Sequence, residues 1–507
     1  MVIEPWRSYA WSLPFTTLKS PANIITGPMS AFRNPLILLL LVILGSGFAL
    51  SSLSSWVRAL HLLIAVVLFG GIVGVRLGSG ALPVAIRDVS IVLPLYAAFL
   101  TTRSGIDALA RVPGEVALCF IAVVGWLAIC TLNPQDVSGP QLLIGLKVWT
   151  YYIPFVVVGI GLVRRSDAMF KTLRVLLVLG TVTCGVGVLQ ALLVRVIGYE
   201  PAIALFFGKA AFAVTQGFSS YQEGGGVYRI PATFSFGAQY VEFLFLYLTA
   251  AIMVANTDPD SRYRQLGQVA VYLALFAGIV SGTKGALILF PMFFGALFMC
   301  GLVKSRLVVA APVAALIGGV ALVAIGVDVA GLFSFGTKTT QHYLSGFVLE
   351  QIGDALGHGV FGEGIGSSTG AVRYVAVGGG GVVQLGFESY YAKIAAELGA
   401  GGLAIFGMFF LVIAAKAVQI VLRYRWTAGN ALTAPLAIYI VFNLLYSAKG
   451  FVLDTDPGNI FFWLALGLLF GLDLELRSTR AVDEGIIPVD PPLPMAGAAQ
   501  RQATAGS

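Results

Sequence analysis

Residues 387–415 read FESYYAKIAAELGAGGLAIFGMFFLVIAA, and this stretch shows the pattern that decides the fold. Three ionisable residues, Glu388, Lys393 and Glu397, stand directly before a long apolar run. Apolar runs of about 20 residues, the length that a helix needs to cross a bilayer, recur along almost the whole chain. The 507 residues are 58% hydrophobic and 11% charged, with a mean hydropathy of +0.90. A soluble domain is about 25% charged, so the composition predicts a membrane protein.

The expected fold class is an all-α polytopic integral membrane protein with about 12–14 transmembrane helices and one large extracytoplasmic loop. Thirteen candidate spans can be placed on the chain. They are residues 35–53, 58–76, 84–102, 114–132, 141–163, 173–196, 236–256, 265–281, 284–303, 307–329, 400–422, 431–449 and 458–474.

Basic residues mark alternate loops, and Lys and Arg favour the cytoplasmic side of a membrane. The predicted cytoplasmic segments contain Arg103 and Arg111; Arg164, Arg165, Lys171 and Arg174; Arg262 and Arg264; Lys304 and Arg306; Arg423 and Arg425; and Arg477 and Arg480. The loops between them, residues 133–140, 197–235, 330–399 and 449–457, are therefore predicted to face outward.

The N-terminal region does not follow this alternation. Thirteen spans with a cytoplasmic tail put the N-terminus outside, although Arg7, Lys19 and Arg33 favour the cytoplasm. Two interpretations stay open: one of the first three spans is miscounted, or residues 1–34 lie along the membrane surface.

The patterns divide the chain into five segments. They are an N-terminal polar segment without a cleavable signal peptide (1–34), a first transmembrane bundle (35–329) with an outer loop at 197–235, the large extracytoplasmic loop (330–399), C-terminal transmembrane helices (400–474) and a disordered cytoplasmic tail (475–507). A loop of the size of 330–399 is usually functional. Within it, residues 341–356 have helical spacing.

Three basic residues near the outer surface are candidates for an anion site. Lys284 lies in SGTKG between two closely spaced spans, where small residues and free N–H groups at a helix N-terminus suit an anion. Arg229 lies in YRIPATFSF just before a span, and Arg373 lies in the large loop. Each has an ordinary alternative: a snorkelling lysine at a helix end, a membrane anchor and a solvated side chain.

Several other kinds of site are not indicated. The segment GEGIGSSTG resembles a phosphate-binding glycine run, but it follows no predicted strand and lacks a Walker lysine. The cysteines have no metal-type spacing and fit small buried hydrophobes; they are Cys119, Cys130, Cys184 and Cys300. Asp454-Thr455-Asp456 fits a structural turn. We therefore expect no metal and no cofactor, and the net charge of +7 needs no nucleic acid to explain it.

Four segments in fixed order resemble the landmarks of the O-antigen ligase and polymerase superfamily, which are membrane glycosyltransferases of the bacterial envelope. YRIPATFSFGAQYVEF matches an arginine, a Gly/Pro-Thr-Phe segment and a span, and SGTKGAL matches a turn in which arginine is usual at the lysine position. HGVFGEGIGSS matches a Gly-rich loop segment, and ESYYAKIAAELGAGGL matches a polar pair before a Glu-Leu-Gly helix start. DTDPGNIFFWLALGLLFG is a weaker fifth match. The resemblance covers residues 229–470 and implies a GT-C-like architecture.

The resemblance also implies roles for individual residues. Ligases of this family have His-Asn at the polar pair, where the histidine helps the acceptor hydroxyl attack, but this chain has Glu388-Ser389. A carboxylate can act as the general base, and polymerase-like members have Glu-Ser, so Glu388 is the expected catalytic residue. Arg229, Lys284 and Arg373 are expected to bind the diphosphate of the donor. The expected supporting residues are Lys147, Ser389, Glu397 as a cap or brace of its helix, and His358 in a structural role.

The implied activity is inverting, metal-independent glycosyl transfer at the periplasmic face of the bacterial inner membrane. The donor is a glycan on a polyprenyl diphosphate in the outer leaflet, and the acceptor is a sugar hydroxyl. The first expectation is a polymerase of O-antigen or exopolysaccharide repeat units, working beside a flippase and a chain-length regulator. The alternative is a ligase that transfers glycan to lipid A core or to protein.

A third interpretation is a transporter or flippase for lipid-linked glycans. Such a protein would need ionisable residues in the middle of its spans. Among the ionisable residues considered for the outer surface, only Lys147 and Glu242 lie inside predicted spans, both near an outer end. This distribution favours chemistry at the surface over passage through the membrane.

Overall fold

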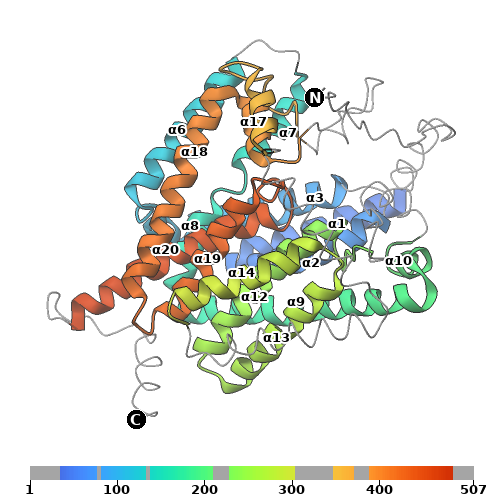
Figure 1. Ribbon diagram of the computed structural model, residues 1–507, viewed down its shortest axis with the longest axis vertical. Coiled ribbons are helices and arrows are strands. Elements are labelled where there is room, and N and C mark those ends of the chain that lie inside the picture. Colours follow the sequence, from blue (N-terminus) through green and yellow to red (C-terminus); the bar gives the residue numbers. More distant parts are fainter. Residues whose placement is uncertain are drawn as a thin grey trace, which may run out of the picture.

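The computed structural model describes residues 35–76, 81–132, 137–208, 228–302, 346, 348–369 and 387–483, and these residues form helices and turns without a strand (Figure 1). The helices are α1 (Pro35–Ser54), α2 (Trp56–Arg76), α3 (Ala81–Arg87), η3 (Asp88–Val92), α4 (Leu93–Leu100), α5 (Arg103–Leu109), α6 (Gly114–Leu132), α7 (Gly139–Thr150), α8 (Phe155–Val163), α9 (Ser166–Ile197), α10 (Tyr199–Phe207), α12 (Gly237–Thr257), α13 (Ser261–Val280), α14 (Lys284–Met299), α17 (Val348–Leu356), α18 (Tyr390–Tyr424), α19 (Asn430–Tyr446) and α20 (Gly458–Asp483).

The prediction of a polytopic, all-helical membrane protein is confirmed for the described residues. Eight of their helical segments are long and apolar enough to cross a membrane, and a bent pair, Val84–Leu100 with Arg103–Leu109, makes up to nine. Three shorter apolar helices, Ile43–Ser54, Leu289–Met299 and Asn430–Tyr446, lie within the predicted spans 35–53, 284–303 and 431–449 or overlap them. The predicted span 307–329 lies outside the described residues.

The structure corrects several predicted boundaries. The predicted span 84–102 is a continuous helical run of α3, η3 and α4 with a π-helical stretch at Asp88–Val92, and the chain then turns by 89° into α5. The predicted span 141–163 corresponds to one candidate span, Gly139–Val163, with a turn between α7 and α8. The predicted tail from residue 475 begins inside α20, which continues to Asp483. The predicted helix at 341–356 is described only as α17, from Val348.

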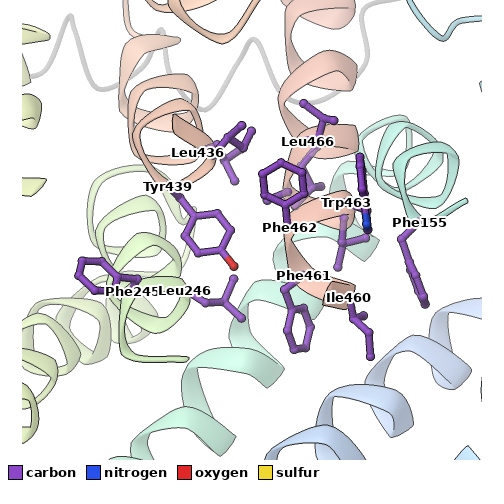
Figure 2. Close-up of a cluster of buried hydrophobic side chains, with 14 of the residues drawn as sticks. Phe155, Phe245, Leu246, Leu436, Tyr439, Ile460, Phe461, Phe462, Trp463 and Leu466 are labelled. Carbon is purple, nitrogen blue, oxygen red and sulfur yellow. The ribbon is translucent and has the colours of Figure 1, made fainter. Parts of the chain in front are cut away.

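The core forms where α8, α12, α19 and α20 meet (Figure 2). Small residues let α8 and α20 approach closely: a Cβ on Gly467 would lie 2.0 Å from the backbone oxygen of Val156, and one on Gly159 would lie 2.5 Å from that of Leu464. Close backbone approach through small residues is a common way to pack helices in lipid, where apolar side chains gain little by leaving the solvent. Aromatic rings of Phe461, Phe462 and Trp463 then fill the neighbouring space.

The loops with the predicted cytoplasmic arginines lie together, and we call this side the basic end. Arg164 bonds Asp107 at 2.9 Å, and Arg425 donates to the backbone oxygen of Met299 at 2.7 Å. Arg111 and Glu475 approach to 3.8 Å. These contacts join loops that the charge pattern assigned to one side of the membrane.

The opposite side, which we call the outer end, contains residues 228–236, 281–283, 357–369, 387–389 and 447–457. Its segments are tied to one another as well: Ile230 N donates to Ser281 O at 2.9 Å, and Tyr390 N donates to Ser447 O at 2.9 Å. A described part of the predicted large loop therefore lies at the end of the bundle away from the basic clusters.

Thiol labelling tests the predicted orientation. In a variant without the native cysteines, Asp354→Cys on α17 should react with a membrane-impermeant thiol reagent in intact spheroplasts, because α17 lies within the predicted extracytoplasmic loop and Asp354 is exposed. Ser478→Cys, which is exposed at the basic end, should react only after lysis. Labelling of position 478 but not 354 before lysis would reverse the orientation.

Candidate functional site

The first two segments of the family resemblance pack against each other at the outer end. The backbone of Ile230 bonds that of Ser281, which places the Arg229 segment directly on the turn that begins α14 at Lys284. Thr233 fixes the Arg229 segment to α2, because its backbone oxygen accepts from Ile72 N at 3.1 Å and its hydroxyl donates to the backbone oxygen of Leu68. Arg229 is thus held beside a helix N-terminus by backbone contacts on both sides.

The third and fourth segments also pack against each other. The helix α18 has a kink at Gly399, whose φ of 70° is in the left-handed region that favours glycine. There Ala400 N donates to Gly359 O at 3.0 Å and Gly401 N to Val360 O at 3.2 Å. In return, Glu363 N donates to Ala396 O at 2.7 Å and Gly364 N to Glu397 O at 3.1 Å.

The Gly-rich segment therefore replaces helical hydrogen bonds that the kink in α18 leaves open. A Cβ on Gly399 would lie 2.1 Å from the oxygen of Val360, so this approach requires glycine. The predicted loop boundary at 399 coincides with this kink, and the helical turns before it, from Tyr390, contain Lys393 and Glu397. Their polar partners come from segments distant in sequence.

Glu397 is the brace that the sequence suggested for it. Its carboxylate is fully buried and accepts hydrogen bonds from Trp149 Nε1 at 2.8 Å, Gly366 N at 3.1 Å, Ser368 N at 3.0 Å and Thr369 Oγ1 at 2.8 Å. The carboxylate thus ties α7 and the Gly-rich segment to α18. With its oxygens occupied in this way, Glu397 has a structural role.

A buried ion pair connects α18 to the loop before α20. Lys393 is fully buried, and its amine lies 2.7 Å from Asp454 and 3.9 Å from Glu397. The Tyr390–Ser447 backbone bond joins the start of α18 to the end of α19. A Cβ on Gly285 at the start of α14 would lie 3.5 Å from the Tyr446 hydroxyl. These contacts bring the two pairs of segments to one place.

Charged groups gather at this junction. Glu388 is exposed just before α18, Arg229 is half-buried, and Lys449 is half-buried in the turn after α19. Burial lowers the pKa of the Lys449 amine, the nearby charge of Arg229 lowers it further, and the carboxylate of Glu388 acts against both. The Nε of Arg229 is buried and has no hydrogen-bond partner among the residues that the structure describes. Two cations and one carboxylate therefore lie close enough to influence one another.

The neighbours of Glu388 position its backbone. Ser389 is the N-cap of α18, and its buried hydroxyl accepts from Ala392 N at 3.4 Å. The side-chain oxygen of Gln351 on α17 accepts from both Glu388 N and Ser389 N at 3.1 Å. Sequence reasoning missed Gln351. Its only signal was that it lies in a segment with helical spacing.

His358 pairs with Glu363 at 3.0 Å, and both side chains are partly exposed. This contact fits the expected structural role of His358, since it joins the two ends of a tight turn.

Lys147, in the last turn of α7, belongs to a second polar cluster. It pairs with Asp88, which also accepts from the Tyr152 hydroxyl at 2.9 Å. Arg87, only 3% exposed, lies 2.9 Å from Asp88 and 2.5 Å from Asp456. Sequence reasoning did not weigh Arg87 and Asp88, although an adjacent Arg-Asp pair inside a predicted span is itself a signal of a buried ion pair. The structural roles expected for Asp454 and Asp456 fit these contacts.

The side chains of two predicted diphosphate ligands lie outside the described part of the structure. Lys284 begins α14 at the junction, but the structure describes only its backbone. Arg373 lies outside the described residues.

No protein-family model matches the chain, and no curated protein matches it. The family relationship therefore stays a resemblance based on the four segments.

Proposed function

We propose that this protein is a membrane glycosyltransferase that polymerises glycan repeat units from a polyprenyl-diphosphate donor. The observation that supports it most strongly is the meeting of the four segments named above, which are separated by up to about 160 residues in sequence (229 to 388). Segments that contribute to one active site are expected to carry the motifs of a family and also to lie close together in the fold.

The charges at the junction suit this reaction. Transfer forms a bond from the acceptor oxygen to the anomeric carbon and breaks the bond from that carbon to the phosphate oxygen. Negative charge then develops on the departing diphosphate, and fixed cations and helix N-terminal N–H groups can stabilise it. Arg229 and the start of α14 at Lys284 supply these groups.

Glu388 is the proposed base. Its carboxylate is exposed and so is open to an acceptor, and its backbone is fixed by Gln351. It takes the proton of the acceptor hydroxyl as the new bond forms, and attack opposite to the leaving group inverts the anomeric centre. All these steps use the chain's own residues.

The two alternative functions, ligase and flippase, make different demands on the protein. A ligase would use the same donor site but require lipid A core or a protein as acceptor. A flippase would need to move charged groups through the bundle. The buried ions Arg87, Asp88 and Lys393 each have a partner on a segment distant in sequence. This pairing favours a fixed framework over a moving pathway.

Activity in detergent tests the proposal. The purified protein should elongate lipid-linked repeat units without any membrane gradient. Lys284→Ala should lose most of this activity, because a cation at the start of α14 is removed, whereas Lys284→Arg should keep a substantial part. Chain length of the product on a gel is the measurement.

Lys416→Ala is a matched control, since Lys416 pairs with Glu115 on a different part of the protein surface. No elongation by the wild-type protein, with transfer only when lipid A core is supplied, would identify a ligase. Equal elongation by Lys284→Ala would return Lys284 to the role of a helix-end anchor.

A further inference from the structure

The tip of the Gly-rich segment is apolar and exposed. Val360 is 57% exposed and Phe361 is 43% exposed. The ring of Phe361 stacks on Trp126 of α6 with a centroid distance of 5.5 Å and an interplanar angle of 10°. Exposed apolar residues in a loop predicted to lie in water need an explanation, because each loses free energy there.

The depth of this tip can be read from the helices that it contacts. Trp126 lies six residues before Leu132, where α6 ends, which is about 9 Å along a helix that rises 1.5 Å per residue. Val360 bonds α18 just beyond Gly399, where α18 folds back on itself: the ring centroids of Tyr390 and Phe410 lie 6.5 Å apart although the two residues are far apart along the helix. Both helices are candidate membrane spans. The tip therefore lies about 9 Å below the outer end of α6.

The neighbouring surface of α6 and α18 is apolar and exposed at the same time. Ile121, Ile129 and Leu132 on α6 are 66%, 48% and 83% exposed, and Leu411 on α18 is 68% exposed. This is the surface that a spanning helix presents to lipid. The exposed side chains of Val360 and Phe361 continue it.

Backbone polar groups of this segment have hydrogen-bond partners, as a position within the bilayer requires. Irregular backbone is tolerated there only where its polar groups have partners. The kink in α18 provides them: Gly359 O and Val360 O accept from Ala400 N and Gly401 N, and Glu363 N and Gly364 N donate to α18. The polar side chains His358 and Glu363 pair with each other on the two sides of the tip.

We propose that residues 358–363 form a re-entrant turn in the outer leaflet, in which Val360 and Phe361 contact the acyl chains of the bilayer. The occupant of this surface is bilayer lipid, because the surface is continuous with the lipid-facing sides of α6 and α18. The proposal holds whether or not the protein transfers glycans.

Spin labels measure this contact directly. In a variant without the native cysteines, reconstituted in phospholipid vesicles, single cysteines are introduced at Val360, Phe361, Asp354 and Leu411 and labelled. Leu411 reports lipid and Asp354, exposed on α17, reports water. Accessibility to oxygen, which partitions into lipid, is compared with accessibility to a water-soluble nickel chelate.

Labels at 360 and 361 should resemble the label at 411, with oxygen accessibility well above that of the nickel chelate, while 354 shows the reverse. A label at 361 as accessible to the nickel chelate as that at 354 would place the turn in water and overturn the proposal. Exclusion of both reagents would also overturn it, because it would mean that another protein surface, such as a second copy of the chain, covers the turn. Oligomeric state would then be measured to identify that surface.

Discussion

Glu388→Gln should reduce glycan elongation by about 10²–10⁴-fold, the usual cost of losing a general base. Glutamine keeps the shape of the side chain, and the two backbone bonds to Gln351 are untouched, so the protein should still fold. Because Arg229 and the start of α14 are unchanged, binding of the lipid-linked donor should be close to that of the wild-type protein. The decisive result is a loss of turnover with retained donor binding.

Glu350→Gln on α17 is the matched control. Glu350 is also an exposed carboxylate in the same region, but it belongs to neither pair of segments. Its elongation rate should stay near that of the wild-type protein. If Glu388→Gln also elongates glycan at that rate, the carboxylate is not the base and only shapes the entrance.

The pH profile adds a readout that a structural role would not change. A general base acts in its ionised form, so wild-type activity should fall at acidic pH. The residual activity of Glu388→Gln should not show this fall at acidic pH.

The spans could be predicted from sequence because hydropathy depends on local composition. Runs such as 114–132 and 458–474 coincide with α6 and the first part of α20. The alternation of basic loops was also informative, since Arg164 and Arg425 are found at one end of the bundle with the other basic loops. These features need no knowledge of tertiary contacts.

The start of α18 could not be predicted in this way. Lys393 and Glu397 look like loop residues because isolated charges are costly in lipid. Their partners are Asp454 and the Gly-rich segment, which are distant in sequence. The kink at Gly399 could not be predicted either, because the backbone groups that bond α18 there belong to the Gly-rich segment of the preceding loop.

The Arg87–Asp88 pair was missed for a related reason. It lies in an otherwise apolar run, and its third member, Asp456, is 369 residues away. For the site, the sequence pattern identified the segments that meet, but not Gln351 or Lys449, whose relation to Glu388 depends on how α17 and α19 pack.

The second large effect is expected for stability. Glu397→Gln should destabilise the protein by about 3–5 kcal/mol, as is usual when one partner of a buried charged network is removed. The carboxylate accepts from four donors on two oxygens, whereas an amide has one oxygen and an NH₂ group. The donors that then face NH₂ lose their acceptor, and each buried unsatisfied group costs about 1–3 kcal/mol. Lys393 also loses one of its two nearby carboxylates.

Thermal unfolding in detergent measures the loss of stability, and hydrogen exchange shows where it arises. The amides of Gly366 and Ser368, which bond the carboxylate directly, should exchange much faster in Glu397→Gln. Glu115→Gln is the control, because this carboxylate is exposed and pairs with Lys416 at the protein surface; it should change neither unfolding nor exchange at those amides. An unfolding temperature of Glu397→Gln equal to that of the wild-type protein, with both amides still protected, would mean that the Gly-rich segment is held to α18 by the backbone bonds at the Gly399 kink alone.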